Sequence, residues 1–451
     1  MDPVTTAALA SWHLDVWLIA SAVLTVGVYL RGRRILREQM PSRFSRARAA
    51  AFVAGVVTLV IALLSPLDSF SGLILSAHMT QHLLLMMVAP PLLLIGEPGN
   101  ALLRGLPAVI AREGVGPFIA SRPLRRAGHT LTRPAVAWLL FVAATWLWHL
   151  PGPYERAVYS PLWHWIEHTC FFVTAILFWW PVIVPWPSKA AWPPAAMIAY
   201  LLLADIQNTA LAAIFCFSER PLYPLYSLVP RLWDLPVLDD QVLAGVIMWV
   251  PGSIAFLVPV AVIVLRMLDG SARPRVRPSQ FGSSSVFVLA LGAALAPGAM
   301  ADGGRVAVSD TDGPLRVTVF STPDPLRTHH TDLSVMVQPT GDWRPLLDAT
   351  VELTLRKIGT DAVVRALATR EEAHNKLLYA AHLHLPQAGR WNLEAVARHD
   401  LGVARVDVTL EVAPTPWWMH GTSLAAMGFG AGLGLLAAAR SARRRRSRIR
   451  A

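Results

Sequence analysis

Two histidines four residues apart stand within a segment that is apolar enough to enter a lipid bilayer. They are His78 and His82, and the segment is Ser76–Met87. On a helix, residues four apart lie one above the other on the same face. Because imidazole nitrogen is a common ligand of zinc, copper and haem iron, this spacing suits the binding of one metal ion or one planar cofactor.

Other side chains with ligand chemistry occur in similar surroundings. His164 and His168 form a second pair four residues apart, and His13 and His149 each stand beside a tryptophan at the end of an apolar run. Near these histidines, Met79 offers a thioether as a further main ligand candidate, and Asp68 and Glu167 offer carboxylates as secondary candidates. Asp205 lies in the middle of another apolar run, where an ionisable residue is costly and is therefore a candidate for function.

Each of these residues also has a purely structural interpretation. A histidine near the end of a membrane span can bind a backbone carbonyl or reach the lipid headgroups, and this applies most directly to His13 and His149. His82 lies too deep in its run to reach water easily, so the ligand interpretation is favoured for the two pairs. Asp205 has a neighbouring polar residue, Asn208, as an alternative partner.

The composition indicates a protein of the membrane. Of the 451 residues, 54% are hydrophobic and 15% are charged, which is too apolar for an ordinary soluble protein. Runs long enough to span about 30 Å of hydrocarbon lie near residues 12–30, 50–66, 73–95, 134–150, 161–185, 194–215 and 242–265. We therefore expect an all-α polytopic bundle of about seven core spans within residues 10–268.

The basic residues predict the orientation of these spans. Twenty-five of the 40 lysines and arginines fall in alternate connections and in the C-terminal segment, and arginine and lysine near span ends are retained in the cytoplasm. The N-terminus is then outside and the C-terminus is cytoplasmic. The net charge of +11 therefore mostly reflects the arginines and lysines of the cytoplasmic connections and C-terminal segment. The basic linker 269–283 and tail 440–451 are expected to contact the lipid bilayer rather than nucleic acid.

The C-terminal part of the chain has a different character. Within residues 302–413, seven short runs with β-strand character predict a small extracytoplasmic β-sandwich. His330, His382 and His384 are a second candidate ligand set there, although solvated surface histidines are the simpler interpretation. The apolar run 284–301 is interpreted as an eighth span or as a cleavable internal signal-like segment. Residues 417–439 are expected to form a final span.

Several motifs together closely resemble the CtaG family of multi-span cytochrome c oxidase assembly proteins. They are His78–Met86 with Pro90–Pro98, Trp148–Pro151, Trp163–His168 and Asp239–Gly245. The resemblance implies a bacterial plasma-membrane protein that helps to mature a haem-copper cytochrome c oxidase by handling copper on the outer side. It carries over five candidate ligands, which are His78, His82, His149, His164 and His168. Residues 314–413 are weakly similar to the YtkA-like and FixH-like outer domains.

Three functions remain open at this stage. The first is a non-enzymatic assembly factor that passes copper to oxidase subunits. The second is a copper transporter, suggested by Asp205, Asn208 and the break at Pro251 and Gly252 in the seventh span. The third is a haem-binding membrane redox protein whose imidazoles come from different spans. No nucleophile and base arrangement indicates a hydrolase, and the two cysteines, Cys170 and Cys216, do not form a disulfide framework.

Overall fold

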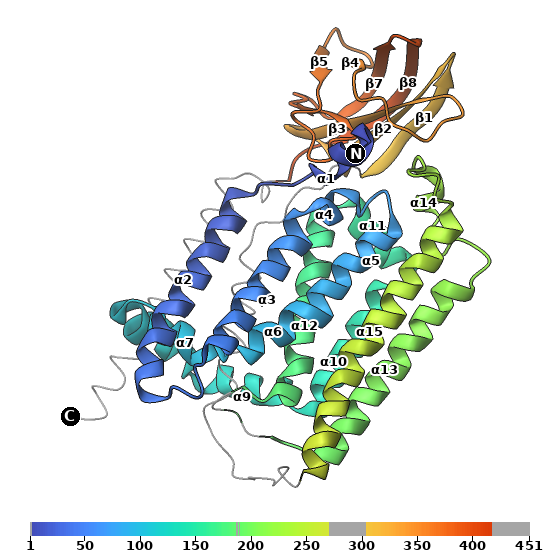
Figure 1. Cartoon of the computed structure of the whole chain (residues 1–451). Helices are drawn as coiled ribbons and strands as arrows, with labels where there is room; N and C mark the ends of the chain where they lie inside the picture. The colour runs from blue at the N-terminus through green and yellow to red at the C-terminus, as the bar shows by residue number, and fades with distance from the viewer. Residues whose placement is uncertain (1, 186–187, 189, 270–303, 417–451) are drawn as a thin grey trace.

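A helical bundle and a β domain make up the structure, a computed structural model (Figure 1). It describes residues 2–185, 188, 190–269 and 304–416. The predicted segment 284–301, the predicted span 417–439 and the tail 440–451 lie outside the described residues, as does nearly all of the linker 269–283. Those predictions therefore stay predictions.

Six helical segments among the described residues are long and apolar enough to cross a membrane. They are α2 (Val16–Gln39), α3 with α4 (Arg46–Leu64 and Pro66–Phe70), α5 to α6 (Leu75–Leu83 and Ala89–Ile95), α12 (Pro161–Ile183), α13 (Pro194–Phe217) and α15 (Val237–Leu268). A seventh candidate is α10 (Pro134–Trp148), which follows α9 (Arg122–Leu131) across a bend of 73°. All seven runs predicted for residues 10–268 are thus helical, and the bundle is confirmed.

Short helices connect these segments. They are α1 (Pro3–Leu9), α7 (Pro98–Gly105), the π-helical turn Ile110–Val115, α8 (Gly116–Ile119), α11 (Pro151–Tyr159) and α14 (Leu225–Leu228). Two of the longer helices, α2 and α3, begin where a polar side chain accepts hydrogen bonds from free backbone N–H groups. Asp15 starts α2 by accepting hydrogen bonds from the N–H groups of Trp17 and Leu18 at 2.8 and 3.0 Å.

Aromatic side chains from α12 fill the middle of the bundle. Phe178 stacks on Phe141 of α10 and on Tyr200 of α13, with ring centroids 4.4 and 4.8 Å apart. Trp179 lies parallel to Phe256 of α15 at 6.0 Å. Because α12 packs against several neighbours, residues on it are held in one place by contacts on many sides.

The span that carries His78 and His82 ends near residue 95, as predicted, although its helix is not uniform. A π-helical segment, Leu84–Val88, joins α5 directly to α6, and Pro90 and Pro91 lie in the first turn of α6. The wider turn accommodates residues that lack an N–H group, so the span continues past the prolines to Ile95.

At the end of this span, a buried carboxylate holds two helices together. Glu97 has a left-handed backbone conformation with φ 57°, and its Oε1 lies 2.5 Å from Nη1 of Arg48 on α3. The hydroxyl of Tyr29 on α2 donates to the carbonyl of Gly96 at 2.6 Å. The Gly-Glu-Pro motif therefore has a structural role here, far along the span from the histidines.

Within the described residues 304–416, eight strands form the C-terminal domain: β1 (Arg305–Asp312), β2 (Leu315–Arg327), β3 (His330–Pro339), β4 (Thr350–Lys357), β5 (Val363–Ala368), β6 (Tyr379–Leu383), β7 (Gly389–His399) and β8 (Gly402–Ala413). All seven predicted strands are present, and β1 was missed. The expected two-sheet sandwich was wrong. The strands form one sheet in the order β5-β4-β7-β8-β2-β3-β6, with β1 paired to β2. A bridge between Thr369 and Ala380 nearly closes it into a barrel.

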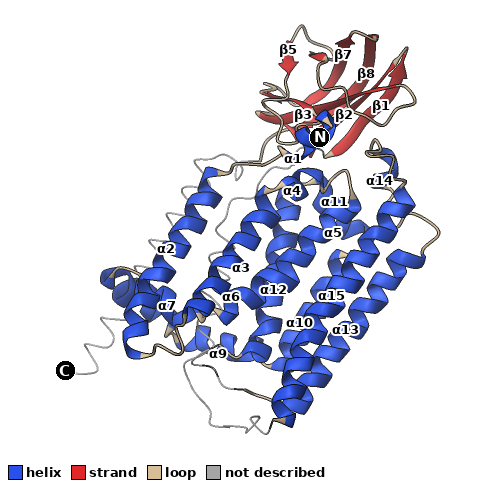
Figure 2. Ribbon diagram, in the orientation of Figure 1, coloured by secondary structure: helices blue, strands red, loops and turns tan. Residues whose placement is uncertain are grey.

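The β domain packs on one end of the bundle, as Figure 2 shows. A shared apolar cluster contains Phe70 of α4 and Tyr154 of α11 together with Phe320 of β2. The side-chain amide of Asn375 donates to the carbonyl of Ser69 at 3.1 Å. The two parts of the chain are therefore joined by both apolar and polar contacts, which the sequence did not predict.

Candidate metal centre

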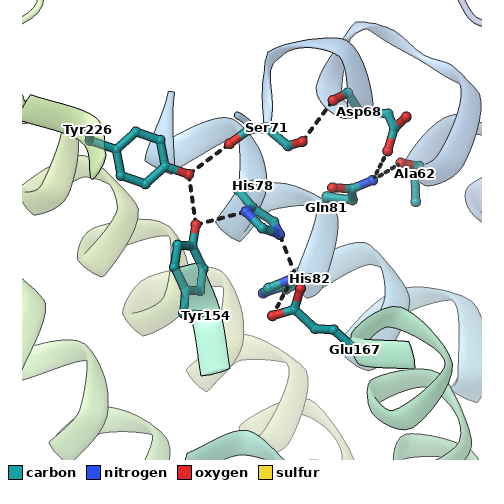
Figure 3. Close-up of polar contacts among 9 residues, drawn as sticks. All are labelled: Ala62, Asp68, Ser71, His78, Gln81, His82, Tyr154, Glu167 and Tyr226. Carbon is teal, nitrogen blue, oxygen red and sulfur yellow. Dashed lines mark hydrogen bonds and ion pairs between the residues drawn. The ribbon is translucent and has the colours of Figure 1, made fainter. Parts of the chain in front are cut away.

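Four buried side chains from two helices form a group with metal-binding chemistry. His78 and His82 come from α5, and Glu167 and His168 come from α12. Each offers one ligand atom, and these four atoms all lie within 4.8 Å of one another. Figure 3 shows how His78, His82 and Glu167 face each other. We call these four residues the His/Glu cluster.

Two more predicted histidines lie beside the cluster. The ring of His164 is 5.2 Å from that of His78 and 4.1 Å from that of His168, measured between centroids. The ring of His149 is 5.9 Å from that of His82. The structure therefore brings all five histidines carried over from the family resemblance to one place.

The carboxylate at the centre lacks the partners that a buried charge needs. Oε2 of Glu167 is 3.7 Å from Nε2 of His78, and Oε1 is 3.7 Å from Nε2 of His82, which is too long for a hydrogen bond. Glu167 is fully buried, and neither of its oxygens has a hydrogen-bond partner among the described residues. A buried carboxylate without compensation is strongly unfavourable.

The imidazoles have open positions as well. Nε2 of each of the five histidines is buried and has no hydrogen-bond partner among the described residues. Such groups are rare in folded proteins, because each one loses its hydrogen bonds to water without replacement. A cation at this place would receive nitrogen and oxygen lone pairs and would compensate the charge of Glu167. The residues present thus fit a metal ion.

Hydrogen bonds outside the cluster orient two of the rings. Nδ1 of His149 donates to the carbonyl of Thr145 at 2.6 Å, so its proton is on Nδ1 and the lone pair is on Nε2. Nδ1 of His78 is 2.7 Å from the hydroxyl of Tyr154. Outer partners of this kind set the tautomer and the direction of ligating histidines.

Tyr154 and a second tyrosine next to it, Tyr226, lie on α11 and α14, outside the spans. Burial raises the pKa of both hydroxyls well above their usual value of 10, and for Tyr154 the neighbouring Tyr226 adds to the effect. Both phenols are therefore neutral at physiological pH and keep their protons for hydrogen bonding.

A side chain from α15 fixes the start of α5. The first backbone N–H groups of α5 have no partner from their own N-cap residue, Ile74. The carboxylate of Asp240 accepts them instead, from Leu75 at 2.7 Å and from Ser76 at 3.0 Å. Because His78 follows one turn later, this contact sets the position of the first cluster ligand.

Gln81 secures the other side of α5. Its side-chain amide donates to Oδ1 of Asp68 and to the carbonyl of Ala62, both at 2.8 Å (Figure 3). Asp68, predicted as a secondary ligand, thus contacts the helix that carries the histidines and is not part of the His/Glu cluster.

Three other predicted residues of the bundle lie away from the cluster. Met79 is fully buried in the apolar cluster shared with the β domain. Asp205 accepts a hydrogen bond from the hydroxyl of Ser253 on α15 at 2.7 Å. His13 contacts His374 of the β domain, with ring centroids 3.9 Å apart. Neither Asp205 nor His13 belongs to the group of ligand atoms found among the described residues.

The histidines of the β domain do not form a comparable centre. His382 is 48% exposed and its Nδ1 is 3.6 Å from Oδ1 of Asp332. His384 is exposed on the same face of the strand region. For His330 the structure describes the backbone alone, as the first residue of β3. In the described part of the β domain, no three ligand side chains come together.

A pocket reaches the cluster from the interface with the β domain. Its walls include His78 and His164 from the bundle and Gly304 and Thr322 from the β domain. The cluster is thus near the end of the bundle that carries the β domain, and the pocket connects it to that interface.

Some residues around the site were missed from the sequence. Tyr154, Tyr226 and Asp240 act on the cluster through hydrogen bonds, and none was a candidate. Asp240 belongs to the motif Asp239–Gly245, which supported the family resemblance. That motif could have marked Asp240 as a candidate residue of the site. The tyrosines had no signal of their own, because they come from short connecting helices far away in the sequence.

Comparison with known proteins agrees with this architecture. Residues 27–269 match the family described as cytochrome c oxidase caa3 assembly factor (Caa3_CtaG). An uncharacterized protein of Mycobacterium bovis is 26% identical over 279 residues, which are 60% of this chain and 41% of that protein. A protein of Mycobacterium tuberculosis gives the same values.

An uncharacterized protein of Mycobacterium leprae is 23% identical over 278 residues, which are 61% of this chain and 42% of that protein. The chain thus spans about two fifths of the length of these relatives. The family match covers the helical bundle, including the His/Glu cluster and its supporting residues. Because this match extends over more than half of its length, the chain belongs to the Caa3_CtaG family of cytochrome c oxidase caa3 assembly factors.

Proposed function

We propose that this protein is a non-enzymatic assembly factor that holds copper at the His/Glu cluster and passes it to a haem-copper cytochrome c oxidase. The observation that carries the proposal is Glu167, a buried carboxylate without a hydrogen bond, facing imidazole nitrogens that also lack partners. The family description supports the role in oxidase assembly.

The donor set favours copper among the metals that imidazole binds. The cluster offers imidazole nitrogens and one carboxylate, and neither Cys170 nor Cys216 belongs to it. For nitrogen and oxygen ligands, affinity rises along the first-row divalent metals to a maximum at copper. Copper is the cargo in this proposal, so the site must also release it.

The position of the cluster supports release on one side of the membrane. The pocket at the β-domain interface lies against His78 and His164. With the orientation inferred from the arginines, this end of the bundle faces outward. In this proposal the β domain, as a YtkA-like or FixH-like module, contributes the wall of the exit and a surface for the oxidase subunit.

The two alternatives have less support in the structure. The side chains that suggested a transport path have structural partners: Asp205 pairs with Ser253, and Asn208 donates to the carbonyl of Met248 at 2.9 Å. For haem, the rings of His78, His82 and His168 pack against one another with centroids 4.4–6.1 Å apart. This spacing fits one ion better than a porphyrin plane between facing ligands.

The proposal is tested in cells that make the caa3-type oxidase. We expect the double variant His78→Ala with His82→Ala to accumulate in the membrane but to leave the oxidase poor in copper and weakly active. His129→Ala, an exposed histidine on α9, is the matched control. Full oxidase maturation in the double variant would contradict the proposal. A fall in cytosolic copper would favour transport instead.

A further inference from the structure

A continuous chain of hydrogen bonds runs from the metal centre to the end of the bundle that carries the β domain (Figure 3). It starts at Nδ1 of His78, 2.7 Å from the hydroxyl of Tyr154. That hydroxyl lies 2.8 Å from the hydroxyl of Tyr226. Tyr226 in turn donates to the carbonyl oxygen of Ser71 at 2.7 Å.

The carbonyl oxygen of Ser71, at the end of this chain, determines where the proton of each hydroxyl lies. A carbonyl oxygen can only accept, so the single proton of Tyr226 points to Ser71. The contact between the two phenols then needs the proton of Tyr154, which Tyr154 donates to Tyr226. The oxygen of Tyr154 is left as an acceptor for His78. This is the one arrangement in which each of the three contacts contains a proton.

We propose that Tyr154 and Tyr226 are positioning residues that hold His78 in the Nδ1–H tautomer, with the lone pair of Nε2 directed at the metal. Nε2 is the atom that faces Glu167. This inference extends the proposed function. It depends on the proposed function only for the identity of the metal ion that binds Nε2 of His78. The tautomer itself follows from the protein's own hydrogen bonds.

The two tyrosines are themselves held firmly. The ring of Tyr154 stacks on Tyr223 at 3.9 Å with the planes 16° apart, and Tyr223 donates to the carbonyl of His149 at 2.9 Å. The acceptor at the end of the chain is fixed because the hydroxyl of Ser71 donates to the carbonyl of Asp68 at 2.8 Å. The chain can therefore impose an orientation on His78.

The same tyrosines link the cluster to elements outside the spans. Tyr154 lies on α11 and Tyr226 on α14, two connecting helices at the β-domain end. A shift of either helix would change the hydrogen bond at Nδ1 of His78 before it changed any metal ligand. The affinity of the site is then adjustable from the surface on which the β domain sits.

The tautomer is measured on the metal-free protein by ¹⁵N NMR with labelled histidine, in lipid nanodiscs. The signals that disappear in His78→Gln belong to His78. We expect a protonated Nδ1 and an unprotonated Nε2 in the wild type. In Tyr154→Phe, which lacks the acceptor, we expect this preference to be lost. Tyr226→Phe should also weaken it, because the proton of Tyr154 then loses its acceptor and can be donated to Nδ1 of His78 instead.

Copper affinity is measured on the same variants. We expect Tyr154→Phe to lower it by about 10- to 100-fold without changing the number of ions bound, as for other outer partners of metal-bound histidine. Tyr159→Phe, on the same short helix, is the control and should leave affinity unchanged. The thermal stability of the metal-free variants identifies any general loss of structure.

The outcomes separate this inference from the proposed function. A proton on Nε2 of His78 in the wild type, or the same tautomer in the wild type and in both tyrosine variants, would overturn the inference. The expected tautomer pattern together with no copper binding by any variant would leave the positioning role intact and would contradict the proposed function.

Discussion

At the scale of single residues, Glu167 determines what the site can do. In a bundle of apolar helices, a carboxylate without hydrogen bonds costs free energy in the metal-free state. A glutamine at the same place would be cheaper to bury but would lack the negative charge that a cation needs. Replacing Glu167 by glutamine should therefore weaken the binding of copper and stabilise the metal-free protein.

We predict that Glu167→Gln lowers copper affinity at least about 10-fold and raises the melting temperature of the metal-free protein. Both are measured on purified protein, by competition with a copper chelator and by thermal unfolding. Glu219→Gln, an exposed glutamate, is the control and should change neither. Lower stability of metal-free Glu167→Gln with normal affinity would mean that Glu167 has a structural role only.

The sequence predicted the ligand residues better than their surroundings. Spacing of four placed the histidines in two pairs, and the pattern of helix ends placed the pairs at one end of the bundle. Both Met79 and Glu167 are next to a histidine in the sequence, and from the sequence Met79 was among the main ligand candidates and Glu167 only among the secondary ones. On the helix, Met79 points into the apolar cluster while Glu167 faces the imidazoles.

At the scale of elements, α5 is held at its start by a residue from another helix. Asp240 accepts two backbone hydrogen bonds from α5, and no side chain of α5's own N-cap replaces it. The neighbouring Asp239 is exposed. The two adjacent aspartates therefore offer a matched pair for measuring the effect of this cap.

We predict that Asp240→Ala lowers the free energy of unfolding by about 0.5–2 kcal/mol, as for other helix caps. It should also lower copper affinity, because His78 and His82 move with the start of α5. Asp239→Ala should change neither quantity by a comparable amount. Equal effects of the two substitutions, in chemical denaturation and copper titration, would contradict the positioning role of Asp240.

Two features of the β domain were not predicted correctly, and each has an identifiable cause. The strand β1 was missed because it is mostly polar and exposed, with weak alternation. The sandwich was wrong because strand runs do not show which strands pair, and the pairing of β2 with β8 joins the strands into one sheet.

At the scale of the whole molecule, the proposed delivery of copper depends on which side of the membrane the cluster faces. The β domain covers one end of the bundle (Figure 2), and residues of both parts line the pocket beside His78 and His164. The arginine distribution predicts that this end is outside, while the connection that contains α9 is cytoplasmic.

We predict that a cysteine introduced at Thr409 of β8 reacts with a membrane-impermeant maleimide in intact cells from which any outer membrane has been removed. A cysteine at Arg125 of α9 should react only after the membrane is opened. Both are made in a background with Cys170→Ser and Cys216→Ser. The reverse pattern of labelling would place the cluster on the cytoplasmic side and would exclude delivery to an outward-facing oxidase site.

The contact between the helical bundle and the β domain could not be predicted from the sequence. Nothing in the strand pattern marks Asn375 as a partner of Ser69, since a contact 306 residues apart depends on the final shapes of both domains. The family match likewise covers residues 27–269 and does not include the β domain.

The most direct measurement is the copper content of the purified full-length protein after loading and removal of excess metal, together with X-ray absorption at the copper edge. We expect a single copper ion per chain with nitrogen and oxygen neighbours, and no bound copper in the double variant His82→Ala with His168→Ala, whose ligands come from two helices. Equal copper in the wild type and in this double variant, or a sulfur-dominated coordination shell, would contradict a metal centre at the His/Glu cluster.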